Sequence, residues 1–149
     1  MRDDAPKDVP SPIDFRRMEE ARDWAEAAMV KTRGLTHINL AVRDAERSLQ
    51  FYRQVFGAEA YSRQDGMIHA KTPGAWDVIT FDENAPRAGE TAGVVHFGFR
   101  LLDPSDIGQA VAEVKQAGGT VLRQGEFAPG FPYAYVSDPD GYEVEIWFE

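Results

Sequence analysis

The sequence predicts an α+β fold of two tandem βαβββ modules, which form an open curved sheet around a central cleft and follow an N-terminal helix. One observation is that the order strand, helix, three strands occurs twice along the chain. A second is that His37 lies seven residues before a helix-capping Asp44, while His96 lies seven residues before Asp103. The two histidines therefore hold equivalent places in two matching strands.

A third observation is a match near the end of each half. The stretch 72–79 (TPGAWDVI) aligns without gaps on 138–145 (DPDGYEVE). Self-similarity of this kind is the sequence signature of a duplicated structural unit. In this alignment Glu145 stands where the first half has Ile79, so we expect Glu145 to face the same concave surface as the two histidines.

Residues 1–33 form an N-terminal extension that precedes the repeat. The first ten residues (MRDDAPKDVP) carry little apolar surface, so we expect a mobile tail. From Ser11, a residue type that caps helices, apolar side chains recur at helical spacing as far as Met29, and Gly34 ends the segment. We expect an amphipathic helix that docks on the domain or on a partner subunit.

The repeat itself is one domain, residues 34–149, whose first module is residues 34–83. A buried strand is expected first, then a helix that Asp44 caps and Gly57 ends. Short strands separated by Asp-Gly and Pro-Gly turns follow. The expected strands are 35–42, 59–63, 67–71 and 77–81. Residues 84–93 (NAPRAGETAG) are a linker by composition.

The second module, residues 94–149, copies this order. Asp103 with Pro104 begins its helix, and Gly118-Gly119 ends it. The expected strands are 94–101, 120–123, 133–137 and 143–148.

Composition limits the function classes. The chain has 149 residues, a formal net charge of −9 and no cysteine. Nucleic acids and anionic membrane surfaces both attract basic segments, so we expect neither as a partner. The absence of cysteine excludes disulfides and thiolate sites and fits a reducing cytoplasm, where we expect the protein to reside. No apolar run approaches the length of a membrane span.

The equivalent histidines predict a metal site. His37, His96 and Glu145 supply two neutral imidazoles and one carboxylate, which suit one divalent ion: Fe, Mn, Ni or Zn. Three protein ligands leave coordination positions open for water and substrate, as in catalytic rather than structural sites. The sequence thus predicts a catalytic centre with two histidines and one glutamate.

Other roles for these residues stay open at the level of sequence. A histidine inside an apolar strand is more often a hydrogen-bonded core residue than a ligand. Glu145 can instead face solvent on an edge strand, and Glu143 is the substitute ligand if the strand register differs. His69 has no histidine as its repeat partner, so we expect it on the surface or at a pocket wall.

These motifs resemble the vicinal oxygen chelate superfamily, which includes glyoxalase I, fosfomycin-modifying thiol transferases, extradiol dioxygenases and bleomycin-resistance proteins. The resemblance rests on 35–57 (LTHINLAVRDAERSLQFYRQVFG), 94–107 (VVHFGFRLLDPSDI) and 135–147 (YVSDPDGYEVEIW). It implies that the same three ligands bind the metal, which in turn chelates two neighbouring oxygens of a small-molecule substrate.

Departures from individual members narrow the reaction. Glyoxalase I has a fourth ligand on the last strand of the first module, where Ile79 stands here with Thr80 beside it, so glyoxalase I activity is disfavoured. Three-ligand sites are similar to those of extradiol dioxygenases and fosfomycin-modifying enzymes. Tyr135 matches a tyrosine of the dioxygenase signature, although the histidine that this signature places upstream is absent.

We therefore expect a metal-dependent enzyme, with dioxygenase-type chemistry slightly favoured over lyase or transferase chemistry. Tyr135 is the candidate acid near the metal and Glu143 the candidate base; their alternatives are a core aromatic residue and a solvent-exposed carboxylate. The alternative function is non-catalytic binding, as in bleomycin-resistance proteins. In it, an apolar pocket is lined by Trp76, Phe131, Tyr133 and Trp147. We also expect a homodimer, because superfamily members with one module pair often dimerise and many build the site from two subunits.

Overall fold

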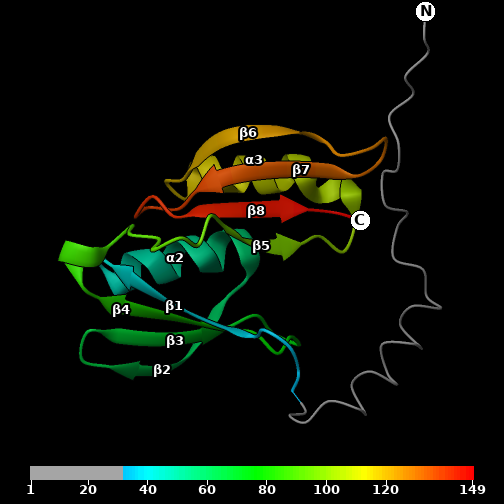
Figure 1. Cartoon of the computed structure of the whole chain (residues 1–149). Coiled ribbons are helices and arrows are strands. Elements are labelled where there is room, and N and C mark those ends of the chain that lie inside the picture. Colours follow the sequence, from blue (N-terminus) through cyan, green and yellow to red (C-terminus); the bar gives the residue numbers. More distant parts are fainter. Residues whose placement is uncertain (1–31) are drawn as a thin grey trace, which may run out of the picture. The chain divides into compact units, whose positions relative to one another are not determined.

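The first module is a four-stranded sheet with one helix (Figure 1). The computed structural model describes residues 32–149, so the predicted N-terminal helix lies outside the described residues. The elements in chain order are β1 (His37–Val42), α2 (Ala45–Phe56), β2 (Glu59–Gln64), β3 (Met67–Lys71) and β4 (Val78–Glu83). The sheet order is β1-β4-β3-β2, with β1 parallel to β4 and the other neighbours antiparallel.

Helix α2 is delimited by the two residues that the sequence singles out. The Asp44 carboxylate accepts a hydrogen bond from the Arg47 amide (2.9 Å), which satisfies one of the free N–H groups of the first turn. Gly57 adopts a left-handed backbone conformation (φ 72°) after the last turn, where a side chain would be strained. The local signals for this helix are therefore confirmed.

The second module follows a linker that contains a short turn of 3-10 helix, η1 (Ala85–Arg87). Its elements are β5 (Phe97–Arg100), η2 (Pro104–Asp106), α3 (Ile107–Gln116), β6 (Thr120–Glu126), β7 (Pro132–Ser137) and β8 (Glu143–Trp147). The sheet order β5-β8-β7-β6 repeats that of the first module. None of the helices in residues 32–149 is long and apolar enough for a membrane span.

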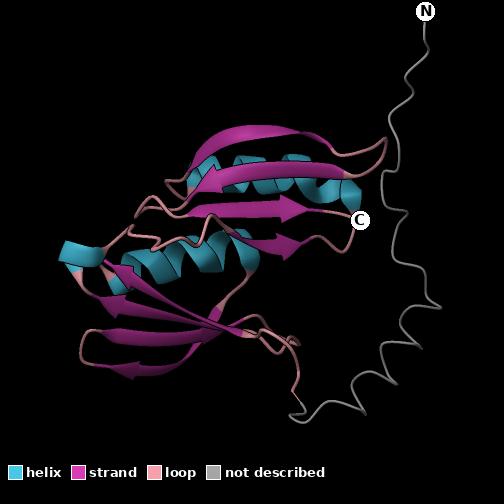
Figure 2. Ribbon diagram, in the orientation of Figure 1, coloured by secondary structure: helices cyan, strands magenta, loops and turns pink. Residues whose placement is uncertain are grey.

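The two βαβββ modules are thus confirmed (Figure 2). The eight strands lie in two four-stranded sheets, and among the described strands none pairs across the modules. As a result, β1 and β5 each keep one edge with which no other described strand pairs. Such an edge presents backbone donors and acceptors that another strand can engage.

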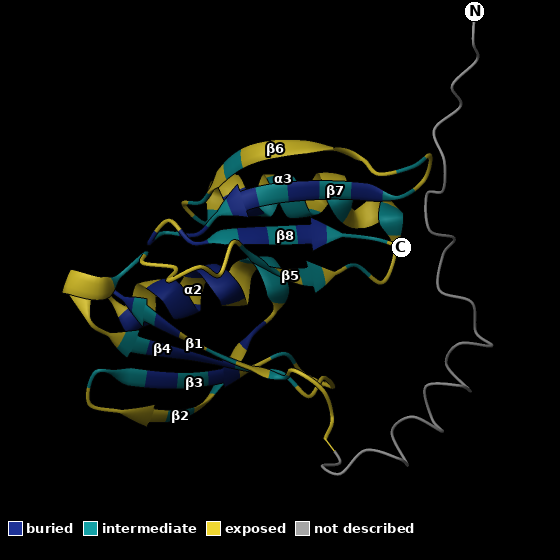
Figure 3. Ribbon diagram, in the orientation of Figure 1, coloured by how far each residue is buried: buried dark blue, intermediate teal, exposed yellow. Residues whose placement is uncertain are grey.

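Each sheet has a core face and an open face. Along β8, Val144 and Ile146 are fully buried, whereas Glu143, Glu145 and Trp147 are only half-buried (Figure 3). Side chains alternate between the two faces of a strand. The three half-buried residues therefore share the open face, where polar groups can be displayed without disturbing the core.

Helix α2 joins the modules through its aromatic side. Ring centroids of Tyr52 and Phe81, in the first module, lie 5.2 Å apart, and those of Tyr52 and Phe99, in the second, lie 6.2 Å apart. Phe56 stacks on Phe99 at 3.7 Å. The Tyr52 hydroxyl donates a hydrogen bond to Asp138 in the β7–β8 turn (2.9 Å). One helix therefore contributes to the cores of both modules.

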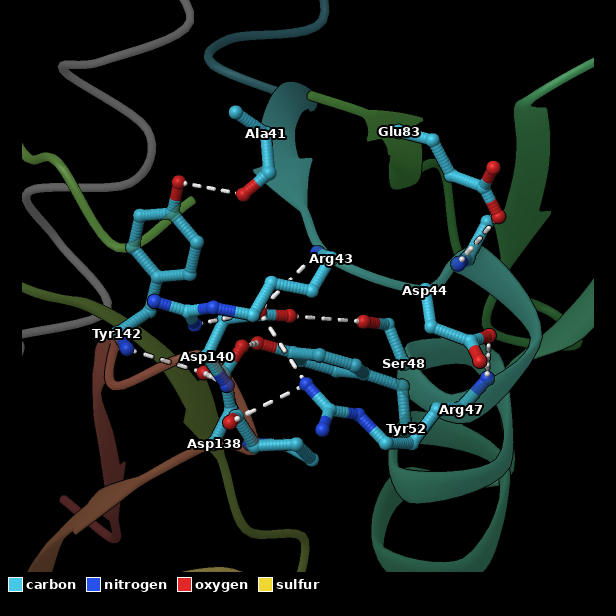
Figure 4. Close-up of polar contacts among 12 residues, drawn as sticks. Ala41, Arg43, Asp44, Arg47, Ser48, Tyr52, Glu83, Asp138, Asp140 and Tyr142 are labelled. Carbon is cyan, nitrogen blue, oxygen red and sulfur yellow. Dashed lines mark hydrogen bonds and ion pairs between the residues drawn. The ribbon is translucent and has the colours of Figure 1, made fainter. Parts of the chain in front are cut away.

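A buried carboxylate secures the same junction (Figure 4). The side chain of Asp140 is closed off from solvent and accepts a hydrogen bond from the Ser48 hydroxyl (3.2 Å). It also pairs with the guanidinium groups of Arg43 (3.0 Å) and Arg47 (3.3 Å). Because these three donors belong to the first module, they hold the β7–β8 turn of the second module in place.

Candidate metal centre

Glu145 is the middle of a polar cluster on the open face of the second sheet. Its Oε2 lies 3.2 Å from Nε2 of His96, and its Oε1 accepts a hydrogen bond from the Tyr135 hydroxyl (2.7 Å). The side chain of Glu145 is 15% exposed and that of His96 is 32% exposed. A carboxylate with so little access to water needs polar partners. Here two groups share that role, one on each oxygen.

Strand register explains why these residues meet. Glu145 is paired with Tyr135 in the β7–β8 ladder and with Gly98 in the β5–β8 ladder. His96 lies two residues before Gly98, directly before β5 begins. A Cβ on Gly98 would lie 2.6 Å from the Trp147 ring and 2.8 Å from the Glu145 carbonyl oxygen. Because Gly98 has no side chain, the Trp147 ring and the β8 backbone at Glu145 can lie this close to β5.

The electrostatics of the cluster keep Tyr135 as a hydrogen-bond donor. Its hydrogen bond to Glu145, followed by burial and the negative charge of Glu145, raises the pKa of Tyr135. The Arg123 guanidinium, 3.8 Å from the centre of the tyrosine ring, acts in the opposite direction. Tyr135 is thus protonated at neutral pH. Glu143, the predicted base, is already engaged in an ion pair with Arg123 (2.8 Å).

The open face of the first sheet carries a cluster around Thr80. The Thr80 hydroxyl oxygen lies 3.1 Å from Nε2 of His37 and 2.9 Å from Nδ1 of His69. Thr80 is fully buried, whereas His37 is exposed. A hydroxyl has one proton to donate and two lone pairs that accept, so it can link both rings. The sequence pattern did not reveal this contact.

The two clusters are equivalent by strand register. The β3–β4 ladder pairs Thr80 with His69, and the β7–β8 ladder pairs Glu145 with Tyr135. The two predicted histidine ligands also hold matching places. His37 is paired with Val78, two positions before Thr80. His96 directly precedes Phe97, whose partner is Val144, so continuing the ladder by one residue sets His96 level with Glu143, two positions before Glu145. Tyr135 is therefore the repeat partner of His69.

The gapless alignment of the two halves is wrong by one residue. It matched Glu145 with Ile79, whereas the register matches Glu145 with Thr80, and Ile79 is buried in the core. The reason is that the loop before β4 (residues 72–77) is one residue longer than the loop before β8 (residues 138–142). Because a neutral hydroxyl is a weak ligand for a divalent ion, the prediction of three ligands is unchanged.

His96 and Glu145 fit a metal ion. With ligand bonds of about 2.1 Å and angles of about 90–110°, neighbouring donor atoms lie about 3.0–3.4 Å apart. The separation of His96 Nε2 and Glu145 Oε2 is 3.2 Å. Nδ1 of His96 is buried without a hydrogen-bond partner in the described residues. The His96 ring therefore makes its polar contact through Nε2, with the Glu145 carboxylate.

The described residues of one chain offer this pair no third ligand. No group of three or more histidine, aspartate or glutamate residues within 32–149 is arranged to hold a metal ion. The structure brings His96, Glu145 and Tyr135 together and places His37 in the matching cluster of the other module. Their shared ligation of one ion stays a prediction.

Aromatic side chains border the Glu145 cluster. Trp147 and Tyr133 are paired across the β7–β8 ladder and share the face of Glu145. Phe127 stacks on Tyr133 at 4.3 Å, which extends this aromatic surface. Of the other aromatic residues predicted for a pocket, Phe131 packs against Phe148 and Trp76 is exposed. Two of the four thus lie beside the cluster.

A groove of about 300 Å³ approaches the same cluster from the side of the linker. It lies between β1 and the segment that leads into β5, and its lining includes Asn39, Asp82, Arg87, Val95 and His96. This volume is at the lower end of the range for small-molecule sites. A small ligand in the groove would lie beside His96.

Comparisons with known proteins place these features in a family context. A model of the Glyoxalase/Bleomycin resistance protein/Dioxygenase superfamily matches residues 34–146. A catechol-2,3-dioxygenase of Bacillus subtilis (strain 168) is 32% identical over 120 residues, which cover 75% of this chain and 41% of the relative. A lactoylglutathione lyase of Neisseria meningitidis is 31% identical over 122 residues, covering 75% of this chain and 88% of the relative.

A manganese-dependent 2,3-dihydroxybiphenyl 1,2-dioxygenase of Geobacillus genomosp. 3 is 28% identical over 115 residues, covering 76% of this chain and 36% of the relative. The chain therefore spans less than half the length of either dioxygenase. Among solved structures, a glyoxalase/bleomycin resistance protein/dioxygenase family enzyme from Burkholderia phytofirmans PsJN aligns with a TM-score of 0.65 at 22% identity, over 76% of this chain and 97% of that chain. At this identity the likeness concerns the fold.

Proposed function

The chain belongs to the Glyoxalase/Bleomycin resistance protein/Dioxygenase superfamily, and we propose that it is a metal-dependent enzyme with a centre formed by His37, His96 and Glu145. The substrate is a small oxygenated molecule that presents two neighbouring oxygens to the metal. Dioxygenase-type chemistry is slightly favoured over lyase or transferase chemistry, since the proposed centre has three ligands and Tyr135 beside it. The dioxygenase and lyase among the relatives support enzymatic activity of one of these kinds.

The observation that carries this proposal is the arrangement around Glu145. One carboxylate oxygen of Glu145 is as far from His96 Nε2 as two donor atoms bound to the same ion would be. The other accepts a hydrogen bond from the Tyr135 hydroxyl. The two proposed ligand side chains, Glu145 on β8 and His96 directly before β5, thus lie close together before any ion binds. Preorganised ligands of this kind are what a catalytic metal site requires.

The chemistry divides between the ion and the chain. A bound divalent ion supplies Lewis-acid stabilisation of negative charge on a substrate oxygen. The Tyr135 hydroxyl orients Glu145 through its hydrogen bond, and it is the candidate hydrogen-bond donor or acid beside a substrate oxygen once that bond is released. The aromatic surface of Trp147 and Tyr133 offers a planar substrate an apolar face next to the reacting oxygens.

A second copy of the chain completes the centre in this proposal, with His37 of the partner subunit joining His96 and Glu145. His37 is exposed, and within residues 32–149 no strand pairs with the outer edge of β1 or β5. Apolar side chains close to both histidines are also exposed: Leu35 to 99% and Val95 to 73%. A partner that covers them would remove apolar surface from water beside both halves of the site.

Metal content tests the proposed centre. Untagged protein purified anaerobically without chelator is expected to contain about one Fe, Mn, Ni or Zn per chain, as for a three-ligand catalytic site. A Glu145→Gln variant should lose the ion or bind it far more weakly. Glu143→Gln is the matched control, because Glu143 lies on the same strand and face but is paired with Arg123.

The outcome decides between the two functions. Equal metal content in wild type and Glu145→Gln contradicts the proposed centre. No metal in any of these proteins, even after each ion is added back, leaves non-catalytic small-molecule binding as the better account, with the aromatic surface as its site. Iron favours dioxygenase chemistry, whereas manganese does not discriminate, because a manganese-dependent dioxygenase is among the relatives. Nickel or zinc favours lyase or transferase chemistry.

A further inference from the structure

His69, in the first module, has no task in the proposed function as stated so far. We infer that His69 is a substrate-contacting residue, whose ring meets one oxygen of the bound molecule while Tyr135 of the other module meets the neighbouring oxygen. This inference rests on the proposed function, because it takes His37 of the partner subunit as the third ligand of the centre.

His69 and Tyr135 hold the same place in the two modules. The β3–β4 ladder pairs His69 with Thr80, and the β7–β8 ladder pairs Tyr135 with Glu145. The contacts match as well. Nδ1 of His69 lies 2.9 Å from the Thr80 hydroxyl oxygen. The Tyr135 hydroxyl lies 2.7 Å from Oε1 of Glu145. In both modules, a polar side chain therefore reaches the residue that contacts the proposed histidine ligand.

The two proposed histidine ligands turn the same nitrogen towards these positions. Nε2 of His37 lies 3.1 Å from the Thr80 hydroxyl oxygen, and Nε2 of His96 lies 3.2 Å from Oε2 of Glu145. By this equivalence, an ion bound at Nε2 of His37 lies on the Thr80 side of the ring. His69 is the next side chain beyond Thr80 on that face, so it borders the space in which the substrate is bound.

The His69 ring has one nitrogen engaged and one left for a ligand. Its Nδ1 contacts the hydroxyl of Thr80, which is fully buried and, as a β-branched residue in a strand, has few rotamers. Within residues 32–149, Nε2 of His69 has no hydrogen-bond partner, and the residue is half-buried. An imidazole nitrogen either donates or accepts a hydrogen bond, so a fixed ring with a free nitrogen suits a substrate oxygen.

This arrangement gives each of two neighbouring substrate oxygens its own polar partner in the protein. Tyr135 lies beside Glu145, and His69 lies in the cluster of His37. Because the proposed centre takes His37 from one chain and Glu145 from the other, the two partners come from different subunits. The substrate is therefore held across the subunit boundary, and His69 acts together with the His37 of its own chain.

Catechol, a planar molecule with two neighbouring hydroxyls, is a suitable probe. Protein loaded with Mn²⁺ is titrated with catechol by calorimetry without oxygen, so the readout does not depend on turnover. His69→Phe is expected to bind catechol about 3–10-fold more weakly, which is the usual effect of one lost hydrogen bond. Its Mn²⁺ content should equal that of wild type. His69→Gln keeps a donor and an acceptor and should lose less.

Mixed dimers show which chain supplies the contact. When His37→Ala and His96→Ala subunits exchange, the one intact site takes its His37 from the His96→Ala chain. His69→Phe added to that chain should weaken catechol binding about 3–10-fold at unchanged metal content. His69→Phe added to the His37→Ala chain is the matched control, and this mixture should bind catechol as the mixture without it does.

The outcomes separate this inference from the proposed centre. If the mixed dimers bind metal and catechol affinity is unchanged in both arrangements, the role of His69 is overturned and the centre stands. An equal loss in both arrangements indicates a change in packing and also overturns it. If the mixed dimers bind no metal although subunit exchange is shown, the centre fails and the inference fails with it. His69→Ala takes the place of His69→Phe if the latter does not fold.

Discussion

Thr80 on β4 and Glu145 on β8 occupy the same position in their modules. Thr80 links His37 to His69 on β3, and Glu145 links His96 to Tyr135 on β7. The geometry of the repeat is therefore kept while its chemistry differs, with a neutral hydroxyl in one module and a carboxylate in the other. A metal centre built from both modules is asymmetric for this reason.

Tyr135→Phe should weaken metal binding, because the variant loses the hydroxyl that holds Oε1 of Glu145. The expected loss is about tenfold, within the usual range for an outer-shell partner. Isothermal titration with Mn²⁺ measures it. Tyr133→Phe is the control, since Tyr133 lies on the same strand and face but does not contact the Glu145 carboxylate. An equal loss in both variants would point to packing instead of the hydrogen bond.

Gly98→Ala should destabilise the second sheet and weaken the centre together. The added Cβ meets the Trp147 ring at 2.6 Å and the Glu145 carbonyl oxygen at 2.8 Å, so one of these groups must move. The expected cost is about 1–3 kcal/mol of unfolding free energy, as for other overpacked sites. Urea denaturation measures this cost. Gly108→Ala, in helix α3 with open space around the new Cβ, should instead stabilise by about 0.5–1 kcal/mol. A neutral result for Gly98→Ala would contradict the close packing.

Asp140→Asn should loosen the junction between the modules. The buried carboxylate accepts hydrogen bonds from Ser48 and from two half-exposed arginines. Hydrogen bonds to a charged group contribute about 1.5–3 kcal/mol each, but exposure of the guanidinium groups reduces this, so we expect a total loss of about 1–3 kcal/mol. Glu46→Gln removes an exposed pair with Arg63 and should cost less than about 1 kcal/mol. If the denaturation midpoints of Asp140→Asn and Glu46→Gln fall by the same amount, the central role of Asp140 is refuted.

The pH dependence of stability should reveal Asp138. Burial, as the largest cause, raises its pKa in the folded protein. A raised pKa means that the folded state favours the protonated carboxyl. The corresponding stabilisation is present below the ordinary pKa of about 3.9 and is lost as pH rises through the folded pKa. The free energy of unfolding of wild type minus that of Asp138→Asn should therefore fall with rising pH and then level off.

Asp103 supplies a control of opposite sign. Hydrogen bonds from the Ser105 side chain and amide lower the pKa of this exposed carboxyl. Its contribution is present above the ordinary pKa and is lost as pH falls through the lowered value. The free energy of unfolding of wild type minus that of Asp103→Asn should therefore rise with pH. If the two differences change in the same direction, the assignment of one of the shifts is wrong.

Local signals were sufficient for the order and most bounds of the elements. Asp44 and Gly57 delimit α2 by capping alone, which depends on neighbouring residues and not on the rest of the fold. The strand predicted from residue 94 begins only at Phe97, where its pairing with β8 begins. Val94 instead closes a turn through its hydrogen bond to the Thr91 carbonyl (2.9 Å). Strand length here is set by a partner far along the sequence.

The candidate site was predictable where it depends on the repeat. His96 and Glu145 could be chosen from matching positions, and the structure brings them together. The contact of His69 with Thr80 could not be predicted, because one extra residue in the loop before β4 displaced the alignment of the two halves. A shift of one residue exchanges the two faces of a strand, so the alignment selected the buried Ile79 in place of Thr80.

The most direct test of the proposed centre is metal rescue by mixing two inactive variants. His37→Ala and His96→Ala should each bind no Mn²⁺ on their own. After the two are mixed and their subunits exchange at random, half of the dimers contain one intact site, which gives about a quarter of an ion per chain for a two-fold symmetric assembly. Recovery of this amount, measured by elemental analysis after gel filtration, is the predicted result. No recovery, with each single variant still folded and exchange shown by tagged subunits, would contradict a centre that His37 of one chain completes in another.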